Sequence, residues 1–350
     1  MAVKRSILGY PSPAVSLMNP IPTPPHPFET LTPDLIGDAL ESAGWQPDGR
    51  IMALNSYENR VFQVGLDEGS FAIAKFYRPG RWTDEAILEE HEFLKELQAA
   101  EIPVAPMLED AEGKSLFHFA DFRFSLSPRI GGRPPETEDL DTLESLGRLI
   151  ARIHAVGKLH PFHHRPTVDP LTYGHRPGLR ILESGLIPTS LHKPYEEALV
   201  SALSAIDAAF ESTGPVSTIR VHADAYPGNI LTTSEGPLLL DFDDARIGPR
   251  VQDLWMLAQG DEADRRMALM TLIEGYDTFE SFDLRELRLI EPLRTLRLIH
   301  YSEWLSARTE DPAFPRAFPD FGTPAYWTER TVELSNQVER MLEPPLSLLP

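Results

Sequence analysis

The arrangement of apolar residues changes once along this chain, and that change limits the folds open to it. Within residues 51–77, a short alternating run and a second, mostly apolar run are separated by a glycine-containing turn, which is typical of paired strands. Beyond residue 136 the apolar residues recur mainly at helical spacing. Residues 127–132, with one proline and two glycines, separate the two regions. The pattern predicts an α+β fold with a small lobe, a hinge and a larger helical lobe.

These signals divide the 350 residues into four segments. Residues 1–30 hold seven prolines and are expected to form a disordered tail. Residues 31–126 are predicted to form the small lobe, with an antiparallel sheet and one main helix. Residues 127–132 are the predicted hinge, and residues 133–350 are the predicted helical lobe. Two lobes suit this length, because single cores stop growing near about 250–300 residues.

Two helix starts and a second hairpin are predicted inside the small lobe. Thr32 precedes a proline and an aspartate, which is the pattern of an N-cap followed by proline at the first helical position. Thr83 and Asp84 cap a second amphipathic run that includes Leu94 and Leu97. A further hairpin is expected within residues 107–126. The second helix is the main helix of the predicted lobe.

The strongest chemical signal lies in an island of predicted strands and loops at residues 219–244. Asp224 is followed five residues later by Asn229, and Asp241 ends a run of three leucines. This is the spacing of a catalytic loop and a metal-binding aspartate in kinases, where one carboxylate takes the proton of the acceptor hydroxyl. An amide oxygen and a second carboxylate hold magnesium against the triphosphate. The alternative is a polar turn followed by a strand that ends in solvated acids.

Three residues upstream are candidates for contacting ATP. Lys75 lies within an apolar strand, and we expect its ammonium to contact the α- and β-phosphates; the alternative is a charge on an edge strand. We expect Glu90 to hold Lys75, because Leu94 and Leu97 continue the same helix face; Glu89 is the alternative. Ser56 lies in a loop that could cover the phosphates or be an ordinary hairpin loop.

Other polar residues near these motifs receive structural interpretations. Asp243 and Asp244 are interpreted as surface charges rather than ligands of a second metal ion. Asp253 either braces the catalytic loop or is an acid that suits the first turn of a helix. His154 is expected to make a structural hydrogen bond at a helix end, and a zinc site among His154, His160, His163 and His164 is not favoured.

Charge and composition restrict the partners. A net charge of −21 argues against nucleic acid, which requires basic surface, and mildly favours a cationic second substrate. No apolar run approaches a membrane span. The absence of cysteine excludes disulfides and thiolate chemistry. We expect a monomeric cytoplasmic protein, since prolines interrupt the basic start before the apolar core of a signal peptide develops.

The order Lys75, Glu90, His222-x-Asp224, Asn229 and Asp241 resembles the aminoglycoside phosphotransferase and choline kinase superfamily. From about residue 28 onward the chain is more closely similar to the bacterial stress response kinase A family. The segments that carry this resemblance are residues 54–61, 75–79, 81–83, 87–91, 164–167, 251–257 and 311–315. The resemblance implies the bilobal fold of protein kinases, outside which the proline-rich tail lies.

The resemblance also implies a function and residue roles. It implies a cytoplasmic serine/threonine protein kinase of stress survival that uses ATP and Mg²⁺, with Asp224 as proton acceptor. Asn229 and Asp241 would be the magnesium ligands, and Ser56 would contact ATP. One departure is Ala223, where the family usually has glycine, so a methyl group would strain the loop if this position needs positive φ.

Two further hypotheses remain open. One is a small-molecule kinase that phosphorylates a hydroxyl of an amine-bearing metabolite or aminoglycoside. The other is an inactive protein that binds nucleotide, against which the intact Lys75, Asp224, Asn229 and Asp241 argue. The two kinase hypotheses share the same catalytic groups, so the acceptor site alone separates them.

Overall fold

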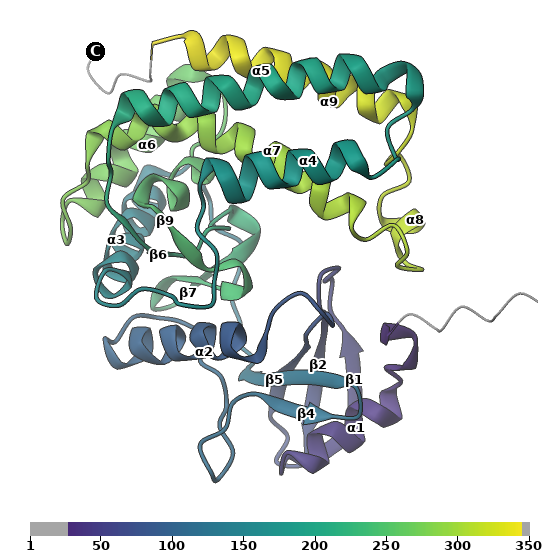
Figure 1. The fold of residues 1–350 in the computed structure, drawn as a ribbon. Helices are drawn as coiled ribbons and strands as arrows, with labels where there is room; N and C mark the ends of the chain where they lie inside the picture. Colours follow the sequence, from purple (N-terminus) through teal and green to yellow (C-terminus); the bar gives the residue numbers. More distant parts are fainter. Residues whose placement is uncertain (1–26, 345–350) are drawn as a thin grey trace, which may run out of the picture.

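The computed structural model describes residues 27–344 and has two lobes (Figure 1). Most of the expected proline-rich tail, residues 1–26, lies outside the described residues. The small lobe contains α1 (Pro33–Ser42), β1 (Pro47–Ala53), β2 (Arg60–Leu66), β3 (Phe71–Phe76), α2 (Asp84–Ala99), β4 (Phe117–Phe119) and β5 (Phe122–Pro128). The expected α+β bilobal fold, with an antiparallel sheet and one long helix in the small lobe, is confirmed.

The large lobe is mostly helical. Its helices are α3 (Leu140–Gly157), α4 (Arg176–Glu183), α5 (Thr189–Thr213), α6 (Glu262–Tyr276), α7 (Ile290–Ser306), α8 (Phe314–Ala317) and α9 (Pro324–Leu342). Its short strands are β6 (Thr218–Val221), β7 (Ile230–Thr233), β8 (Gly236–Leu239) and β9 (Arg246–Pro249). They form two-stranded pairs, β6 with β9 and β7 with β8; the predicted island at residues 219–244 holds β7, β8 and most of β6, whereas β9 follows it. Among the described residues, no helix is both long and apolar enough to cross a membrane.

Local sequence signals place the helix starts of the small lobe. Thr32 accepts a hydrogen bond from the N–H of Leu35, and Thr83 accepts one from the N–H of Ala86, so both predicted N-caps are confirmed. The second hairpin lies later than expected. It is formed by β4 and β5 across a turn at Ala120, and it continues to Pro128, which is the second residue of the predicted hinge.

The sheet of the small lobe positions Lys75 at its centre. Its strand order is β1-β2-β3-β5-β4, and every pair is antiparallel. Lys75 faces Val61 on one neighbouring strand and Ser125 on the other. The interpretation of Lys75 as an edge-strand charge is therefore wrong, because β3 has a hydrogen-bonded strand on both sides.

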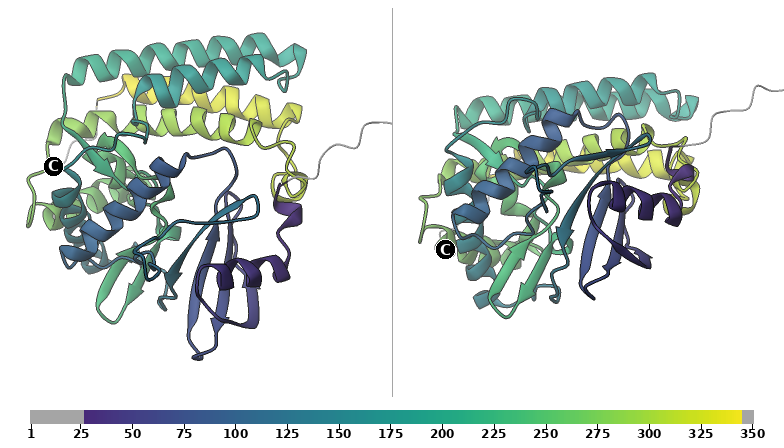
Figure 2. Two further views of the ribbon diagram at one scale, coloured as in Figure 1. Left: turned by 60° about the horizontal axis from the view of Figure 1, so that its bottom comes forward. Right: turned by 90° about the horizontal axis from the view of Figure 1, so that it is seen from below.

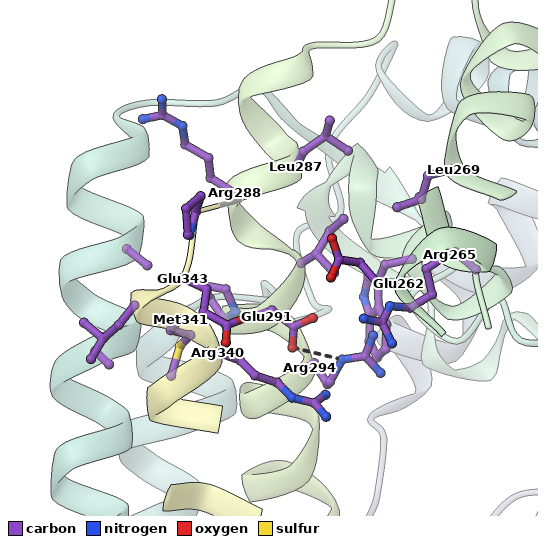
Figure 3. A pocket seen from close by; sticks show the side chains of 18 of the residues that line it. Glu262, Arg265, Leu269, Leu287, Arg288, Glu291, Arg294, Arg340, Met341 and Glu343 are labelled. Carbon is purple, nitrogen blue, oxygen red and sulfur yellow. Dashed lines mark ion pairs between the residues drawn. The ribbon is translucent and has the colours of Figure 1, made fainter. Parts of the chain in front are cut away.

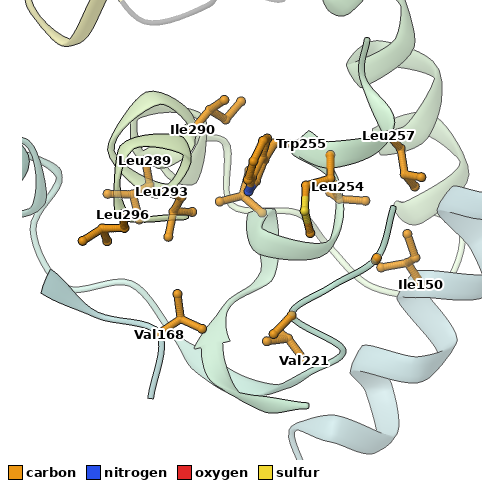
Figure 4. Packing of buried hydrophobic residues seen from close by; sticks show 14 of the residues in the cluster. Ile150, Val168, Val221, Leu254, Trp255, Leu257, Leu289, Ile290, Leu293 and Leu296 are labelled. Atoms are coloured by element: carbon orange, nitrogen blue, oxygen red, sulfur yellow. The ribbon is translucent and has the colours of Figure 1, made fainter. Parts of the chain in front are cut away.

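The core of the large lobe supports the loop that follows β6. Val221 at the end of β6 packs with Leu254, Trp255 and Leu293, which come from the turn after β9 and from α7 (Figure 4). Each of these side chains is at most 6% exposed. A buried apolar side chain contributes about 1.5–3 kcal/mol, so this packing fixes the backbone position at which the polar loop begins.

Segments far apart in sequence meet at the junction of the lobes. Figure 2 shows the yellow-green turn after α7 beside the purple start of the described chain in both views. Tyr57, in the loop between β1 and β2, contacts the rings of Trp304 and Phe318 at centroid distances of 5.6 and 4.9 Å. The aromatic contacts hold the β1–β2 loop against the large lobe.

Candidate active site

A cavity of about 790 Å³ lies between the two lobes. The β1–β2 loop, β3 and α2 border it from the small lobe, and the segments around residues 223–229 and 239–244 border it from the large lobe. All six predicted site residues line it: Ser56, Lys75, Glu90, Asp224, Asn229 and Asp241. The structure therefore brings together residues that are up to 185 positions apart in sequence.

The loop after β6 is held from below by Asp253, at the end of the 3₁₀ turn η5 (Arg250–Asp253). Its carboxylate accepts the N–H groups of His222 and Ala223, each at 2.7 Å, and contacts His154 Nε2 at 3.0 Å. All of these groups are buried. Of the two interpretations of Asp253, the structure supports the one in which it braces the loop. Its hydrogen bonds fix the backbone just before Asp224.

Ala223 adopts the left-handed conformation that the resemblance made a concern. Its φ is +67°, in the region that L-residues other than glycine rarely enter. Its side chain is only 2% exposed. Because φ is positive, the alanine at this position is strained. Two hydrogen bonds hold the conformation: Gln252 Nε2 donates to the Ala223 carbonyl, and the Ala223 N–H donates to Asp253.

Asp224 is held by two side chains. Arg297 Nη1, from α7, lies 2.8 Å from Asp224 Oδ1, and Asn229 Nδ2 donates to Asp224 Oδ2 at 3.0 Å. Burial raises the pKa of Asp224, and the positive charge of Arg297 opposes that shift. The arrangement leaves a carboxylate that can accept a proton, with an orientation fixed by Asn229 and Arg297.

Arg297 is a site residue that the sequence analysis missed. It lies on α7, 73 positions after Asp224, among leucine and isoleucine residues. Arg294 lies three positions earlier on the same helix, so no local feature of the sequence distinguishes Arg297 or identifies its partner. Arg297 is 42% exposed at its side chain, and it borders the cavity.

Lys75 lies among three carboxylates. Its Nζ is 2.8 Å from Asp241 Oδ1, 3.4 Å from Asp243 Oδ1 and 3.5 Å from Glu90 Oε1. Burial lowers the pKa of Lys75, but the carboxylates outweigh burial and raise it well above its usual value. Lys75 is therefore a fixed positive charge at the wall of the cavity.

Glu90, and not Glu89, is the glutamate that contacts Lys75. Glu90 is fully buried, and burial raises its pKa. Glu89 faces the other way and accepts the backbone N–H groups of His163 and His164 at 2.5 and 2.9 Å. The helix face defined by Leu94 and Leu97, both buried, is thus the one that carries Glu90.

Arg165 joins α2 to the large lobe. Its Nη2 donates to Glu90 Oε2 at 3.0 Å and its Nε donates to the carbonyl of Ala86 at 2.7 Å. Its Nη1 donates to the carbonyls of Asp243 and Ala245 at 2.9 and 2.8 Å. Arg165 is 5% exposed, so these bonds satisfy a buried cation and fix Glu90 in position.

The interpretation of Asp243 as a surface charge is wrong, whereas the side chain of Asp244 is 34% exposed but ion-paired. Asp243 is 3% exposed, accepts a hydrogen bond from Asn59 Nδ2 at 3.2 Å and forms a short ion pair with Arg81. Asp244 contacts Arg81 Nη2 at 2.7 Å and Arg246 Nη2 at 3.1 Å. Burial alone would raise the pKa of Asp243, but Arg81 lowers it. Arg81, the partner that Asp243 and Asp244 share, comes from a distant segment, which a local pattern does not reveal.

The β1–β2 loop, which carries Ser56, is anchored on the large lobe. Ser56 Oγ donates to the carbonyl of Asn59 at 3.1 Å within the loop. Glu58 Oε2 accepts hydrogen bonds from Trp304 Nε1 and Arg308 Nε, both at 2.7 Å. The loop borders the cavity without a glycine-rich sequence, and its position depends on these contacts with α7 and the turn that follows.

The donor groups at the base of the cavity fit a hard cation such as Mg²⁺. Asp241 has positive φ and a side chain that is 55% exposed, so its carboxylate faces the open cavity. Asn229 uses its Nδ2 for Asp224, which leaves its amide oxygen as a donor for a cation. Mg²⁺ binds one or two protein oxygens together with substrate phosphates. Asn229 and Asp241 are therefore suitable ligands.

Comparison with protein families and curated proteins places this geometry in context. A model of the phosphotransferase enzyme family matches residues 50–290. Stress response kinase A of Escherichia coli (strain K12) is 42% identical over 323 residues, which cover 92% of this chain and 97% of that protein. The serine/threonine protein kinase RdoA of Salmonella typhimurium (strain LT2) is 41% identical over the same share of each chain.

Solved structures share the fold. Amicoumacin kinase hAmiN, in complex with AMP-PNP, Ca²⁺ and Ami, matches 88% of this chain and 93% of its own with a TM-score of 0.67 at 19% identity. The microcompartment-associated aminopropanol kinase matches 88% of this chain and 97% of its own with a TM-score of 0.63 at 19% identity. At these identities the likeness concerns the fold alone.

Proposed function

Because the chain belongs to the phosphotransferase enzyme family, we propose that it is a kinase that transfers the γ-phosphoryl group of ATP, with Mg²⁺, to a serine or threonine of a protein. The observation that carries this proposal is the cluster of Lys75, Asp224, Asn229 and Asp241 around one cavity. Relatives of 41–42% identity that are named as stress response and serine/threonine protein kinases support the protein acceptor and a role in stress.

Each side chain has a distinct role in this reaction. Asp224 accepts the proton of the attacking hydroxyl, since it is a carboxylate fixed at the cavity. Lys75 neutralises charge on the phosphates, and Ser56 caps them from the β1–β2 loop. Asn229 and Asp241 would hold Mg²⁺, which supplies charge neutralisation to the triphosphate when it is bound.

The acceptor end of the cavity bears on the choice between a protein and an amine-bearing small molecule. Arg297 lies beside Asp224, and His300, Tyr301 and Trp304 follow it on α7 and border the cavity. An ammonium group near this wall would be repelled by Arg297 and would compete with it for Asp224. The arrangement favours an acceptor whose hydroxyl has no cationic group beside it. A serine or threonine side chain is such an acceptor.

The test is transfer of label from γ-labelled ATP with Mg²⁺ to the protein itself and to a generic protein substrate. We expect wild-type protein to label both, and Asp224→Asn to lower the rate by about 10²-fold or more because the general base is lost. Asn keeps the shape of the side chain, and thermal melting will check that the variant is folded. Equal labelling by the variant would contradict the role of Asp224.

A second measurement separates the two acceptor classes. Turnover of ATP will be followed with a panel of amine-bearing alcohols, including an aminoglycoside, under the same conditions. We expect no stimulation above the rate without acceptor. Rapid phosphorylation of one of these alcohols, with no label on protein, would replace the protein acceptor by a small molecule while leaving the roles of Asp224 and Lys75 intact.

A further inference from the structure

A second large cavity lies in the helical lobe, away from the site between the lobes. It has a volume of about 1030 Å³ and shares no lining residue with the cavity that holds Asp224. Helices α5, α6, α7 and α9 border it, together with Trp255 from the 3₁₀ turn η6 (Trp255–Leu257) (Figure 3). Pro344, the last described residue, lies at its edge.

The lining of this cavity has an unusual charge for this chain. Five arginines line it, namely Arg265, Arg266, Arg288, Arg294 and Arg340, beside three glutamates, Glu262, Glu291 and Glu343. The whole chain has 53 acidic residues against 32 lysines and arginines. The composition predicts a negatively charged surface, whereas this cavity has an excess of positive charge. Such a cavity attracts an anionic ligand.

Most of these arginines lack a carboxylate partner. Arg294 Nε lies 3.2 Å from Glu291 Oε2, and this is the only ion pair that the five arginines form within residues 27–344. Arg265 donates to the backbone carbonyl of Gly260 at 3.2 Å, which does not neutralise its charge. The guanidinium groups therefore remain available for an anion.

The guanidinium groups also share one space. Arg265, Arg294 and Arg340 extend toward the region around Glu291, whereas Arg288 points away from it (Figure 3). Burial lowers the pKa of Arg294; Glu291 raises it, and the positive charges of Arg265 and Arg340 lower it further. The three cations come from α6, α7 and α9, and an anion between them would relieve their repulsion.

The remaining wall of the cavity is apolar. Leu269, Leu287 and Met341 line it, and the Arg294 guanidinium lies 4.8 Å from the ring centroid of Trp255. We propose that this cavity binds a small organic phosphate, with the phosphate held by Arg265, Arg294 and Arg340 and the carbon skeleton against the apolar wall. Guanidinium groups bind phosphate oxygens in pairs, which suits a dianionic phosphate better than a single carboxylate.

The test uses the full chain and 1-naphthyl phosphate, which joins a dianion to an apolar ring. Binding is measured by titration calorimetry in a buffer free of phosphate, sulfate and nucleotide, so that no other phosphate group competes for the arginines, and the variants below assign the site. We expect one binding site per chain. We also expect 1-naphthol, which lacks the phosphate, to bind at least about tenfold more weakly because the charged hydrogen bonds are absent.

Matched variants assign the binding to this cavity. The double variant Arg265→Gln and Arg340→Gln is expected to weaken binding of 1-naphthyl phosphate by about tenfold or more. Arg176→Gln, on an exposed arginine at the start of α4 that forms no ion pair within residues 27–344, should bind as wild type does. Thermal melting without ligand should show the double variant at least as stable as wild type, because the substitutions remove repulsion.

Three results would overturn the proposal. The first is no binding of 1-naphthyl phosphate to wild type at millimolar concentration. The second is equal affinity of wild type and the double variant. The third is equal affinity for the phosphate and for 1-naphthol. None of these depends on kinase activity, so they are separate from the test of Asp224.

Discussion

At the scale of single residues, the site depends on two positions with left-handed backbone, Ala223 and Asp241, whose φ values are +67° and +56°. A residue other than glycine costs roughly 1–2 kcal/mol in this conformation. The hydrogen bonds of Asp253 and Gln252 to Ala223 must offset that cost at one position. The strain lies next to Asp224, the proposed general base.

Replacing Ala223 by glycine should relieve this strain. We expect Ala223→Gly to raise the free energy of unfolding by up to about 1 kcal/mol, since the greater freedom of glycine in the unfolded chain offsets part of the gain. The measurement is urea unfolding. Ala225→Gly is the matched control, because Ala225 is fully buried and has no positive φ, and it should destabilise the protein. A loss of stability at both positions would contradict the strain at Ala223.

A second prediction at this scale concerns the pH dependence of the reaction. The Arg297 charge holds the pKa of Asp224 down against the effect of burial. In Arg297→Gln the pKa of Asp224 rises, so the carboxylate is already protonated at a higher pH. The acidic limb of the kcat/KM profile should therefore shift to higher pH. The activity loss should be largest at low pH and shrink as pH rises. Arg297→Lys keeps the positive charge and should shift the acidic limb less. An unchanged acidic limb in Arg297→Gln would show that Arg297 does not lower the pKa of Asp224.

At the scale of elements, local patterns predicted what depends on neighbouring residues and missed what depends on distant ones. The caps at Thr32 and Thr83 follow from signals within a few positions, because the physical interactions are themselves local. Asp243 was misjudged because its partner Arg81 lies 162 positions away. Arg165 likewise acquires its role only when α2 meets the segment around Asp243, and Arg297 only when α7 reaches the loop that carries Asp224.

The contact between two short 3₁₀ elements yields a prediction about stability. Glu286, in η7 (Leu284–Leu289), is fully buried, accepts the N–H of Val251 in η5 at 2.9 Å and lies 4.0 Å from Arg250. Burial raises the pKa of Glu286 from its usual value near 4.5 to about 7. Above pH 4.5 the unfolded chain releases this proton while the folded chain keeps it, so stability falls as pH rises toward 7.

The variant Glu286→Gln should remove this part of the pH dependence. Glutamine keeps an acceptor for the Val251 N–H but does not ionise. At pH 5 the two proteins should be equally stable, and at pH 8 the variant should be more stable by an amount on the order of 2 kcal/mol. Urea unfolding at both values measures the difference. A stability gap that does not change between pH 5 and pH 8 would rule out a buried proton at Glu286.

At the scale of the whole molecule, the lobes are joined by buried polar contacts as well as by the chain. Arg165 bonds α2 to the segment around Asp243, Arg81 pairs with Asp243 and Asp244, and Arg78 Nη2 contacts Asp311 Oδ2 at 2.9 Å. Each contact joins the small lobe to the large lobe. Removing one member leaves a buried charge with fewer partners, and the cost approaches about 3–5 kcal/mol when the remaining partners do not compensate it.

This connection predicts that the two lobes unfold together. In wild type, loss of helix by circular dichroism, which reports mainly the large lobe, should coincide with loss of tertiary structure by tryptophan fluorescence. Arg165→Met removes four hydrogen bonds and leaves Glu90 with Lys75 alone, so we expect a destabilisation of about 3 kcal/mol or more and two separate transitions. Arg176→Met, at an exposed position on α4, should keep a single transition at the wild-type midpoint. Unfolding of Arg165→Met in one step at the wild-type midpoint would show that the Arg165 contacts do not couple the lobes. The position of Glu90 would then depend on Lys75 and on the packing of α2.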